Sequence, residues 1–418
     1  MYSLEEWIRY GDELRRPLLI ADELSDSTHV VIVGGGLSGL TIGYRLASKR
    51  PDINITIVEG SNEFGGVIKT WNHDEWICDL AVNATRSHPA VWRLVDDLSL
   101  GDVFMPSNPD AKHRWVHLKG EPHRLSWWTA LKIGPLRMRR SMIESRKGGC
   151  AVSEVLPHEL IADAMTLGIV NDTSAHVDAD FLFPSLTRFG PNPPIKWSSI
   201  KKKMRDTYPL FTPKKGSLAS FDGGMESLVD ALSSVLKNMP NVSVEFGMHA
   251  ESPEAVAEKF KVPLSSVVWT VPMKSGHPST SLSIFAIGYR KEDISNVKVG
   301  YGTLVPDPNL PISGILHESD IHHSKRAPEG HRLFRLMVPH SRVKDNHQLV
   351  KECAHQLLGS SKSVIFQHLG DREIPSYPPG HMDRISQHDS SFTRAGWAFS
   401  GVSITHVIAE AERIAALF

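Results

Sequence analysis

The chain has 418 residues, of which 41% are hydrophobic and 22% charged, and its formal net charge is −1. This composition is typical of a globular protein with two or three domains and excludes a disordered chain. The balanced charge gives no reason to expect a nucleic-acid partner, and no apolar run reaches the roughly 18 residues of a membrane-spanning helix. The three cysteines, Cys78, Cys150 and Cys353, are too scattered for a metal-ligand motif and indicate reduced structural thiols.

Residues 1–27 do not resemble a mitochondrial transit peptide, because acidic residues outnumber arginines in this segment. We expect the segment to form one amphipathic helix that packs outside the nucleotide-binding part. Its sequence indicates no role.

The stretch from Thr28 to Thr70 predicts a dinucleotide-binding unit. A β-branched run at Val30–Val33 has the length of a buried parallel strand, and a helical pattern runs from Leu40 to about Ser48. A second β-branched run follows at Ile53–Val58. Strand, helix and strand therefore occur in the order of a βαβ nucleotide-binding unit.

Glycines connect the first strand to the helix with the spacing Gly34-x-Gly36-x-x-Gly39. Gly34 is expected to make the tight turn, Gly36 to let a pyrophosphate approach the backbone, and Gly39 to let helix and strand pack closely. Glu59 follows Gly39 by 20 residues, at the distance where a carboxylate binds ribose hydroxyls. The cofactor-binding residues predicted in this stretch are Gly34, Gly36, Leu37, Ser38, Gly39 and Glu59.

A glycine pair, Gly65-Gly66, follows the acidic residue and precedes Thr70. This arrangement resembles the GG-x-x-x-T extension of flavoproteins in the amine oxidase and protoporphyrinogen oxidase group. The extension favours FAD over NAD, and it adds Gly65 and Gly66 to the predicted cofactor site.

The middle of the chain is predicted to contain a hairpin at Trp71–Leu80, a helix through Val91–Leu98 and a hairpin at Arg114–His123. A mainly helical region follows, from about Ser126 to Tyr208. It carries two basic groups, Lys132 to Lys147 and Lys196 to Arg205, each beside tryptophan and aliphatic residues. Charge runs of this kind usually form solvated helix faces, but Trp and Leu beside Lys and Arg also suit a membrane surface.

The second half of the chain is predicted to be mostly β. A helix is expected from Ser220 to Leu236 and another at Gln348–Leu358. The expected strands are Val242–Phe246, Ser265–Val271, Leu282–Tyr289, Val299–Val305, Ile312–His317, Leu333–Val338 and Ser363–His368. At the C-terminus a glycine turn, Gly396–Ile404, leads into a last helix, which is either a second flavin-contacting element or a terminal structural helix.

Four further segments, in the same order along the chain, resemble motifs of the protoporphyrinogen oxidase family of mitochondrial and plant type, within the flavin amine oxidase superfamily. They are Phe221–Leu228, Gly302–Pro306, Ile374–His381 and Ala395–Ile404. The resemblance runs from about Val30 to Ala416 and identifies the chain as a divergent member.

The resemblance implies a multi-domain α/β fold. Residues 1–75, 216–275 and 371–418 are expected to form a Rossmann-type FAD-binding domain of the p-hydroxybenzoate hydroxylase type. Residues 76–95 and 276–370 are expected to form a mixed-sheet substrate domain, and residues 96–215 a helical, membrane-associating domain.

The resemblance also implies an activity, the penultimate step of haem synthesis. Six electrons are taken from protoporphyrinogen IX in three hydride transfers to FAD. Oxygen then reoxidises the flavin and is released as peroxide. The implied location is the surface of the mitochondrial inner membrane. A second copy of the chain and ferrochelatase are further partners that the family suggests, whereas no nucleic acid and no metal are expected.

Further site residues are implied by the resemblance alone. Arg86 is expected to bind a substrate carboxylate, although a surface or structural arginine would look the same. Gly168, Phe285 and Met337 are expected to line the substrate pocket, although an ordinary sheet core would also contain such apolar residues. The remaining cofactor contacts are Met248, Thr270, Trp397, Val402, Ser403 and Ile404, and no side chain is expected to act as a nucleophile or acid-base catalyst.

The chain departs from the family pattern at four places. Ala81-Val82 replaces a glycine-proline pair close to the expected flavin ring, and His406 and Glu412 replace an aspartate and a glycine. The region Val244–Ser281 lacks room for the family's hairpin and connecting helix. A related oxidase of amines or polyenes, or a flavin- or porphyrin-binding homologue without turnover, therefore remains an alternative.

Overall fold

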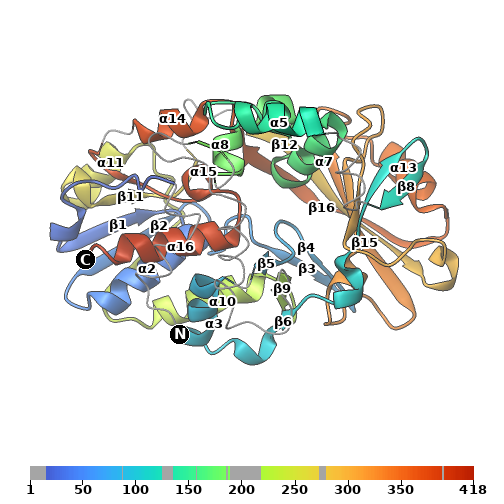
Figure 1. Cartoon of the computed structure of the whole chain (residues 1–418). Coiled ribbons are helices and arrows are strands. Elements are labelled where there is room, and N and C mark those ends of the chain that lie inside the picture. The colour runs from blue at the N-terminus through green and yellow to red at the C-terminus, as the bar shows by residue number, and fades with distance from the viewer. Residues whose placement is uncertain are drawn as a thin grey trace.

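The computed structural model describes residues 16–86, 88–124, 135–156, 158–184, 187–188, 218–272, 279–387 and 390–418. A five-stranded sheet forms one side of the molecule (Figure 1). All of its strand pairs are parallel. In spatial order the strands are β10 (Val242–Phe246), β2 (Asn54–Glu59), β1 (His29–Val33), β11 (Val267–Trp269) and β17 (Thr393–Arg394).

The glycine turn after β1 leads into helix α2 (Leu37–Lys49), as predicted. Gly34 has φ +111°, which a residue with a side chain rarely adopts, and Gly36 is the N-cap of α2. A Cβ atom at Gly39 would lie 1.9 Å from the Gly34 carbonyl oxygen. Gly39 therefore allows α2 to pack directly against the turn that follows β1.

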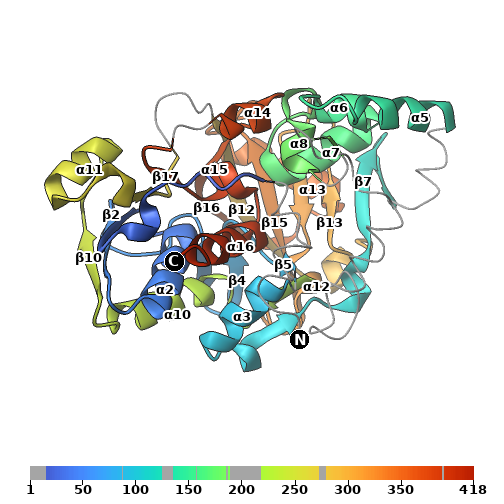
Figure 2. The same cartoon turned by 60° about the vertical axis from the view of Figure 1, so that its left-hand side comes forward.

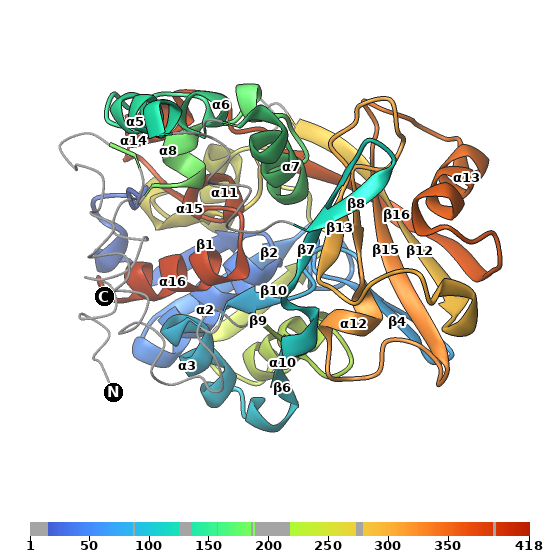
Figure 3. The ribbon, with the colours of Figure 1, turned by 45° about the vertical axis from the view of Figure 1, so that its right-hand side comes forward.

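A seven-stranded mixed sheet forms the other side of the molecule (Figure 3). Its longest strands are antiparallel neighbours, β12 (Ser279–Arg290) and β16 (Ser363–Pro375). The order continues through β15 (His331–Pro339), β14 (Gly314–Leu316), β13 (Gly302–Leu304), β7 (Arg114–Leu118) and β8 (Glu121–Arg124). Because β7 and β8 belong to this sheet, the predicted helical domain at 96–215 is wrong for residues 114–124.

The two faces of this sheet pack against different partners. Leu282 and Ile284 of β12 pack with the helical layer and the C-terminal turn. Phe285 and Ile287 point to the other face and pack against α13 (His347–Leu358). This alternation follows from the two-residue period of a strand.

A layer of helices lies across one end of both sheets (Figure 2). It consists of α5 (Pro135–Glu144), α6 (Val152–Val155), α7 (Glu159–Val170), α8 (Ala179–Leu182) and α14 (His381–Ser386). Val152, Val155 and Phe181 share one apolar cluster with Leu282 and Ile284 of the large sheet. The layer is thereby attached to the sheet by side-chain burial.

Smaller elements connect the two sheets. Strands β3 (Thr70–His73) and β4 (Trp76–Asp79) form the predicted hairpin. A three-stranded sheet contains β5 (Thr85–Arg86), β9 (Leu218–Phe221) and β6 (Phe104–Pro106). The remaining helices of this part are α3 (Pro89–Asp97), α10 (Glu226–Lys237), α12 (Glu318–Ile321), α15 (Trp397–Ser400) and α16 (Ile404–Ala415).

Two predictions about local structure are wrong. Residues 1–15 of the predicted amphipathic helix lie outside the described residues, and the described part, Arg16–Ser27, is not an amphipathic helix, since its helical element is a single 3₁₀ turn at Leu24–Asp26. Its backbone instead pairs with the C-terminal part of the chain through an isolated bridge between Leu19 and Arg394. The region Val244–Ser281 does contain a connecting helix, α11 (Pro253–Phe260), which joins β10 to β11.

All three cysteines are buried and free, as predicted. Among the helices of the described ranges, none has the length and hydropathy needed to cross a bilayer. The second predicted basic group, Lys196 to Arg205, lies outside the described residues, as do Trp127, Trp128 and Lys132.

Replacing Gly39 with alanine tests the close approach of α2 to the glycine turn. Alanine has a higher helix propensity than glycine, but its Cβ would collide with a backbone carbonyl that cannot rotate away. We expect a loss of about 1–3 kcal/mol in the free energy of unfolding, measured by denaturant titration. The control is Gly101→Ala, where no atom lies within 4 Å of the added Cβ, and an equal effect of both variants would contradict the packing role.

Candidate functional site

The carboxylate of Glu59 faces the glycine turn at the end of β2. One oxygen accepts a hydrogen bond from the Gly35 N–H at 2.6 Å, and the other accepts one from Ser61 N–H at 2.8 Å. Met248 lies beside it, because its N–H donates to the Glu59 carbonyl oxygen at 3.1 Å. The structure therefore brings together two predicted cofactor residues that are 189 positions apart.

The glycine pair lies against the same turn. Gly65 donates its N–H to the Gly35 carbonyl oxygen at 2.9 Å, and Gly65 forms an isolated parallel bridge with Gly36. A Cβ at Gly66 would lie 3.1 Å from the Gly36 Cα, whereas a Cβ at Gly36 would meet only Gly66, at 3.8 Å. The described protein atoms thus leave the space in front of Gly36 open at the N-terminus of α2, where a phosphate would be stabilised.

The C-terminal turn reaches this site from the other end of the chain. A Cβ at Gly396, the N-cap of α15, would lie 3.0 Å from the Thr270 carbonyl oxygen and 3.4 Å from Ser38 Oγ. Thr270 Oγ1 donates to the Val33 carbonyl oxygen at 2.8 Å. Ser38 Oγ is buried and has no hydrogen-bond partner among the described residues. An unpaired buried hydroxyl in the first turn of α2 fits a site that a polar ligand completes.

The other predicted C-terminal contacts surround the start of α16. Ser403 is its N-cap and accepts a hydrogen bond from the His406 N–H at 3.1 Å. Ile404 is buried, and Trp397 and Val402 pack against the apolar cluster that contains Leu282. Their contact with a cofactor remains a prediction.

Sequence analysis missed Glu410, a fully buried carboxyl on α16. It accepts a hydrogen bond from the Gly396 N–H at 2.7 Å, and burial raises its pKa to about 8. Glu410 therefore supports the turn that faces Ser38 and Thr270. A carboxyl on the apolar face of the amphipathic C-terminal helix is the sequence signal that would have identified it.

A second buried polar group, centred on Asp79, lies between the two sheets. Asp79 Oδ1 accepts hydrogen bonds from Thr70 Oγ1 at 2.7 Å and from the Met225 N–H at 2.8 Å. A Cβ at Gly224 would lie 2.4 Å from the Thr70 side chain, so the glycine at this position allows Thr70 to approach the segment Phe221–Leu228. The backbone carbonyl of Asp79 accepts from Arg335 on β15.

Carboxylates and arginines alternate around Asp79. Arg326 lies 3.6 Å from Asp79, and Arg335 lies 3.0 Å from Glu318. Burial alone would raise the pKa of Glu318, but Arg335 and His322 hold it at about 2. Asp79, Glu318 and His322 lie close enough together to be considered as metal ligands. The buried arginines already compensate the carboxylate charge, so the group is better explained as an ionic network than as a metal site.

Two of the predicted substrate residues, Gly168 and Met337, lie at the same face of the large sheet and are related through Leu304. A Cβ at Gly168 of α7 would lie 3.0 Å from a methyl group of Leu304. Leu304, Gly314 and Met337 are opposite one another on neighbouring strands. Met337 also packs against the apolar cluster that Val402 and Trp397 contact, which links it to the C-terminal turn.

The structure corrects the prediction for Phe285. Phe285 pairs with Leu336 and Met337 pairs with Ile284, so the two predicted wall residues point to opposite faces of the sheet. Phe285 is buried among Phe366, His347 and His368 on the face that α13 covers. It is a core residue of that face and does not share a pocket with Met337.

Arg86 is exposed on the short strand β5, opposite Leu218. Its position allows contact with a ligand but does not enclose one, and its predicted role as a carboxylate anchor remains a prediction.

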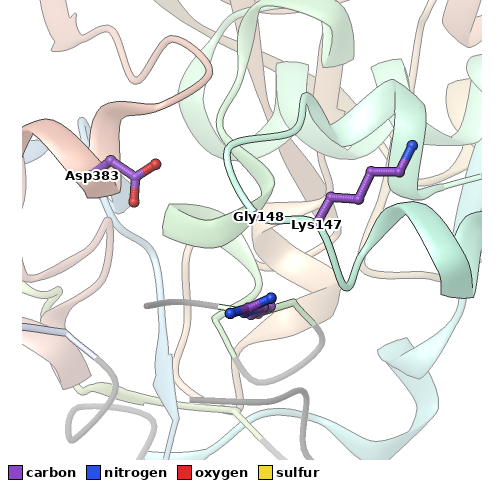
Figure 4. A pocket seen from close by; sticks show the side chains of 4 residues that line it. Lys147, Gly148 and Asp383 are labelled. Atoms are coloured by element: carbon purple, nitrogen blue, oxygen red, sulfur yellow. The ribbon is translucent and has the colours of Figure 1, made fainter. Parts of the chain in front are cut away.

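A separate surface pocket of about 290 Å³ lies in the helical layer (Figure 4). It is lined by Lys147, Gly148, Arg188 and Asp383. Lys147 forms an ion pair with Glu144 at 2.6 Å, and none of the lining residues belongs to the site at the glycine turn. We assign no chemistry to this pocket.

Comparisons with known proteins agree with this arrangement. Residues 32–98 match the model of the NAD(P)-binding Rossmann-like domain family. Protoporphyrinogen oxidase 2, chloroplastic/mitochondrial, of Arabidopsis thaliana is 25% identical over 80% of this chain and 79% of that protein. Coproporphyrinogen III oxidase of Staphylococcus aureus is 22% identical over 86% of this chain and 90% of that protein. The chain is a divergent relative of the protoporphyrinogen oxidases.

Solved structures show the same fold. A protein from Exiguobacterium sp. 255-15, provisionally named a protoporphyrinogen oxidase, has a TM-score of 0.66 at 15% identity. The superposition covers 94% of this chain and 98% of that one. Among the sequence relatives, the L-amino-acid oxidase of Trimeresurus stejnegeri is 33% identical, but the match covers only 21% of this chain. The fold is the mixed α/β, Rossmann-type FAD-binding fold of the amine oxidase group.

The predicted cofactor, FAD, is confirmed by these relatives, which are FAD-dependent oxidases with the same Rossmann-like domain. The residues of this chain fit it, because Gly36 leaves an open cradle, Ser38 offers an unpaired hydroxyl and Glu59 offers a carboxylate. The chain is thus a flavin-dependent oxidase of the superfamily that contains protoporphyrinogen and amine oxidases.

The buried carboxyl of Glu410 predicts a pH-dependent stability. Its folded-state pKa of about 8 lies above the ordinary value of 4.5, so the folded protein loses stability as the pH rises from 4.5 towards 8. The carboxyl lowers the free energy of unfolding by up to about 1.4 kcal/mol per pH unit in this range, and this slope should be absent in Glu410→Gln. Denaturant unfolding at pH 5, 7 and 8.5 measures the difference.

The control for this experiment is Glu254→Gln, an exposed carboxyl on α11. Its curve should run parallel to that of the unchanged protein. If the Glu410→Gln curve also ran parallel, the carboxyl would titrate normally and the assignment would be wrong.

Proposed function

We propose that this chain catalyses the FAD-dependent oxidation of protoporphyrinogen IX to protoporphyrin IX with oxygen as the electron acceptor, the penultimate step of haem synthesis. The observation that carries the proposal is the extent of the similarity to protoporphyrinogen oxidases. It covers 80% to 93% of the chain, and therefore includes the large sheet and the helical layer as well as the nucleotide-binding part. The likeness to L-amino-acid oxidase covers only 21%.

The residues of the chain would bind, orient and shield the reactants. When bound, FAD supplies the acceptor for a hydride from the substrate. The glycine turn, Ser38 and Glu59 would hold its phosphates and ribose, and the C-terminal turn would close over it from the other side. Met337 and Gly168 would offer an apolar surface to a large flat ligand, which excludes water from the reacting atoms.

A second porphyrinogen is also a candidate substrate. The Staphylococcus aureus relative is a coproporphyrinogen III oxidase and is similar over 86% of this chain. Coproporphyrinogen III carries four propionates and protoporphyrinogen IX carries two, so the number of cations at the site would decide between them. Ala81-Val82, which departs from the family pattern, keeps a homologue without turnover as the alternative.

The decisive assay uses the purified protein with its bound FAD. Each porphyrinogen is supplied under air, and porphyrin fluorescence is followed above the rate of autoxidation. Putrescine and L-amino acids are the comparison substrates, and their oxidation is followed by peroxide release. We expect acceleration with one or both porphyrinogens and none with the amines. Bound FAD without any acceleration would contradict the proposed activity.

We also propose that the helical layer rests on a membrane surface, as expected for a peripheral protein of the mitochondrial inner membrane. Helix α5 exposes 80% of Leu136 and 50% of Ile143, beside the exposed basic residues Arg137, Arg139 and Arg140. An exposed apolar pair flanked by arginines suits the boundary between headgroups and acyl chains. Relatives named as chloroplastic and mitochondrial support this location.

Flotation with anionic liposomes tests the membrane surface. Leu136→Glu should reduce the bound fraction several-fold, because it places a negative charge at the centre of the proposed contact. Val364→Glu is the matched control, since Val364 is 48% exposed on β16, away from the helical layer. Equal flotation of the two variants would overturn the proposed contact, and binding should weaken as salt rises.

A further inference from the structure

Arg372 on β16 is half-buried and differs from the buried arginines between the two sheets. Each of three others has a carboxylate at ion-pair distance: Arg326 lies 3.6 Å from Asp79, Arg332 lies 2.7 Å from Asp320 and Arg335 lies 3.0 Å from Glu318. Within the described ranges, no carboxylate lies at such a distance from Arg372. Two carboxylates, Asp79 and Glu318, therefore face three guanidinium groups around the Asp79 turn.

The hydrogen bonds of Arg372 are also incomplete. Its Nη1 donates to the Leu80 carbonyl oxygen at 3.4 Å, which is long for a hydrogen bond. Its Nε is buried and has no partner in the part of the chain that the structure describes. Burial, together with the nearby Arg335, lowers the pKa of Arg372 to about 10. A half-buried guanidinium with these surroundings lacks an anion among the described residues, which is unfavourable unless a ligand supplies one.

The position of Arg372 places it at the junction of the cofactor and substrate residues. It is opposite Leu282 on the sheet face that carries Met337 and that packs against Val402 and Trp397. The carbonyl that it reaches belongs to the turn after β4, which Arg335 holds through the carbonyl oxygens of Asp79 and Ala81. The same turn carries another buried donor without a partner among the described residues, Nδ2 of Asn83.

We propose that Arg372 binds a carboxylate of the substrate and is the residue that selects substrates carrying a free carboxylate at this position. This inference rests on the proposed function, in which the substrate carries propionates. A guanidinium binds a carboxylate through two parallel hydrogen bonds, and Nε and one Nη are the pair that an Arg372 partner would use.

Arg372 is better placed for this task than Arg86. Arg86 is exposed, so its attraction for a carboxylate is weakened by water and by salt. The guanidinium of Arg372 is partly buried on an apolar face, where the same pair of charges interacts more strongly. Arg372 would orient the macrocycle against the sheet, and Arg86 would remain free to contact a second propionate at the surface.

The experiment compares a free acid with its ester, which have the same ring but differ in charge. Protoporphyrin IX and its dimethyl ester are titrated into FAD-loaded protein in detergent, and binding is followed by quenching of tryptophan fluorescence. Arg372→Gln should weaken binding of the free acid by about 10- to 100-fold and leave binding of the ester unchanged. The FAD content of the variant should match that of the unchanged protein, and its thermal midpoint should not be lower, because the substitution removes a cation that has no anion.

Three further variants complete the design. Arg290→Gln is the matched control, because Arg290 is exposed at the end of β12 in the same sheet, and it should bind both ligands normally. Arg86→Gln measures the competing anchor. Arg372→Lys keeps the charge but loses the fork, and it should retain part of the preference for the acid even if the glutamine variant fails to fold.

The outcomes separate this inference from the proposed function. If the unchanged protein binds and oxidises the porphyrin substrate while Arg372→Gln keeps its acid-to-ester preference, the inference fails and the function stands. An equal loss for acid and ester would also overturn it, because shape and not charge would then be involved. If the unchanged protein neither binds protoporphyrin nor oxidises the porphyrinogens, the proposed function fails and the inference falls with it.

Discussion

The two sheets of the molecule are joined by the buried charges around Asp79. Asp79 ends β4 and is bound by Thr70 and the Met225 N–H on the nucleotide-binding side. On the side of the large sheet, Arg335 of β15 binds its backbone carbonyl and pairs with Glu318. Charges removed from water are tolerated only when they are paired and hydrogen-bonded, so the positions of these groups depend on one another.

This interdependence controls geometry more than net stability. Burying an ion pair costs about as much in lost hydration as the attraction returns, whereas removal of one partner leaves an unpaired charge. The turn from Asp79 to Ala81 is therefore held at one distance from the large sheet. The same contacts fix the position of this turn relative to the strand that carries Met337.

The segment Arg16–Ser27 and the C-terminal part of the chain meet beside the glycine turn. Gly396 lies against Ser38 and Thr270, and Glu410 on α16 holds the Gly396 N–H. The segment Arg16–Ser27 adds a second link, since its Leu19 bridges to Arg394. A cofactor at α2 would thus be enclosed by residues from three distant parts of the sequence, and its binding would stabilise their association.

The sequence alone determined the parts of this protein that follow local rules. The turn at Gly34 and the close packing at Gly39 depend on spacing within one βαβ unit, and their geometry agrees with the prediction. Strand positions were also predictable from runs of apolar residues. The length of β16 was not, because its charged part, Gly370–Glu373, lacks such a run.

Tertiary structure alone decided the faces and the partners. Phe285 and Met337 are both apolar strand residues, and only the register of β12 with β15 places them on opposite faces of the sheet. Arg372 looks like an ordinary surface charge in the sequence. The burial of its Nε, and the lack of a carboxylate beside it among the described residues, result from how elements far apart in the chain pack together.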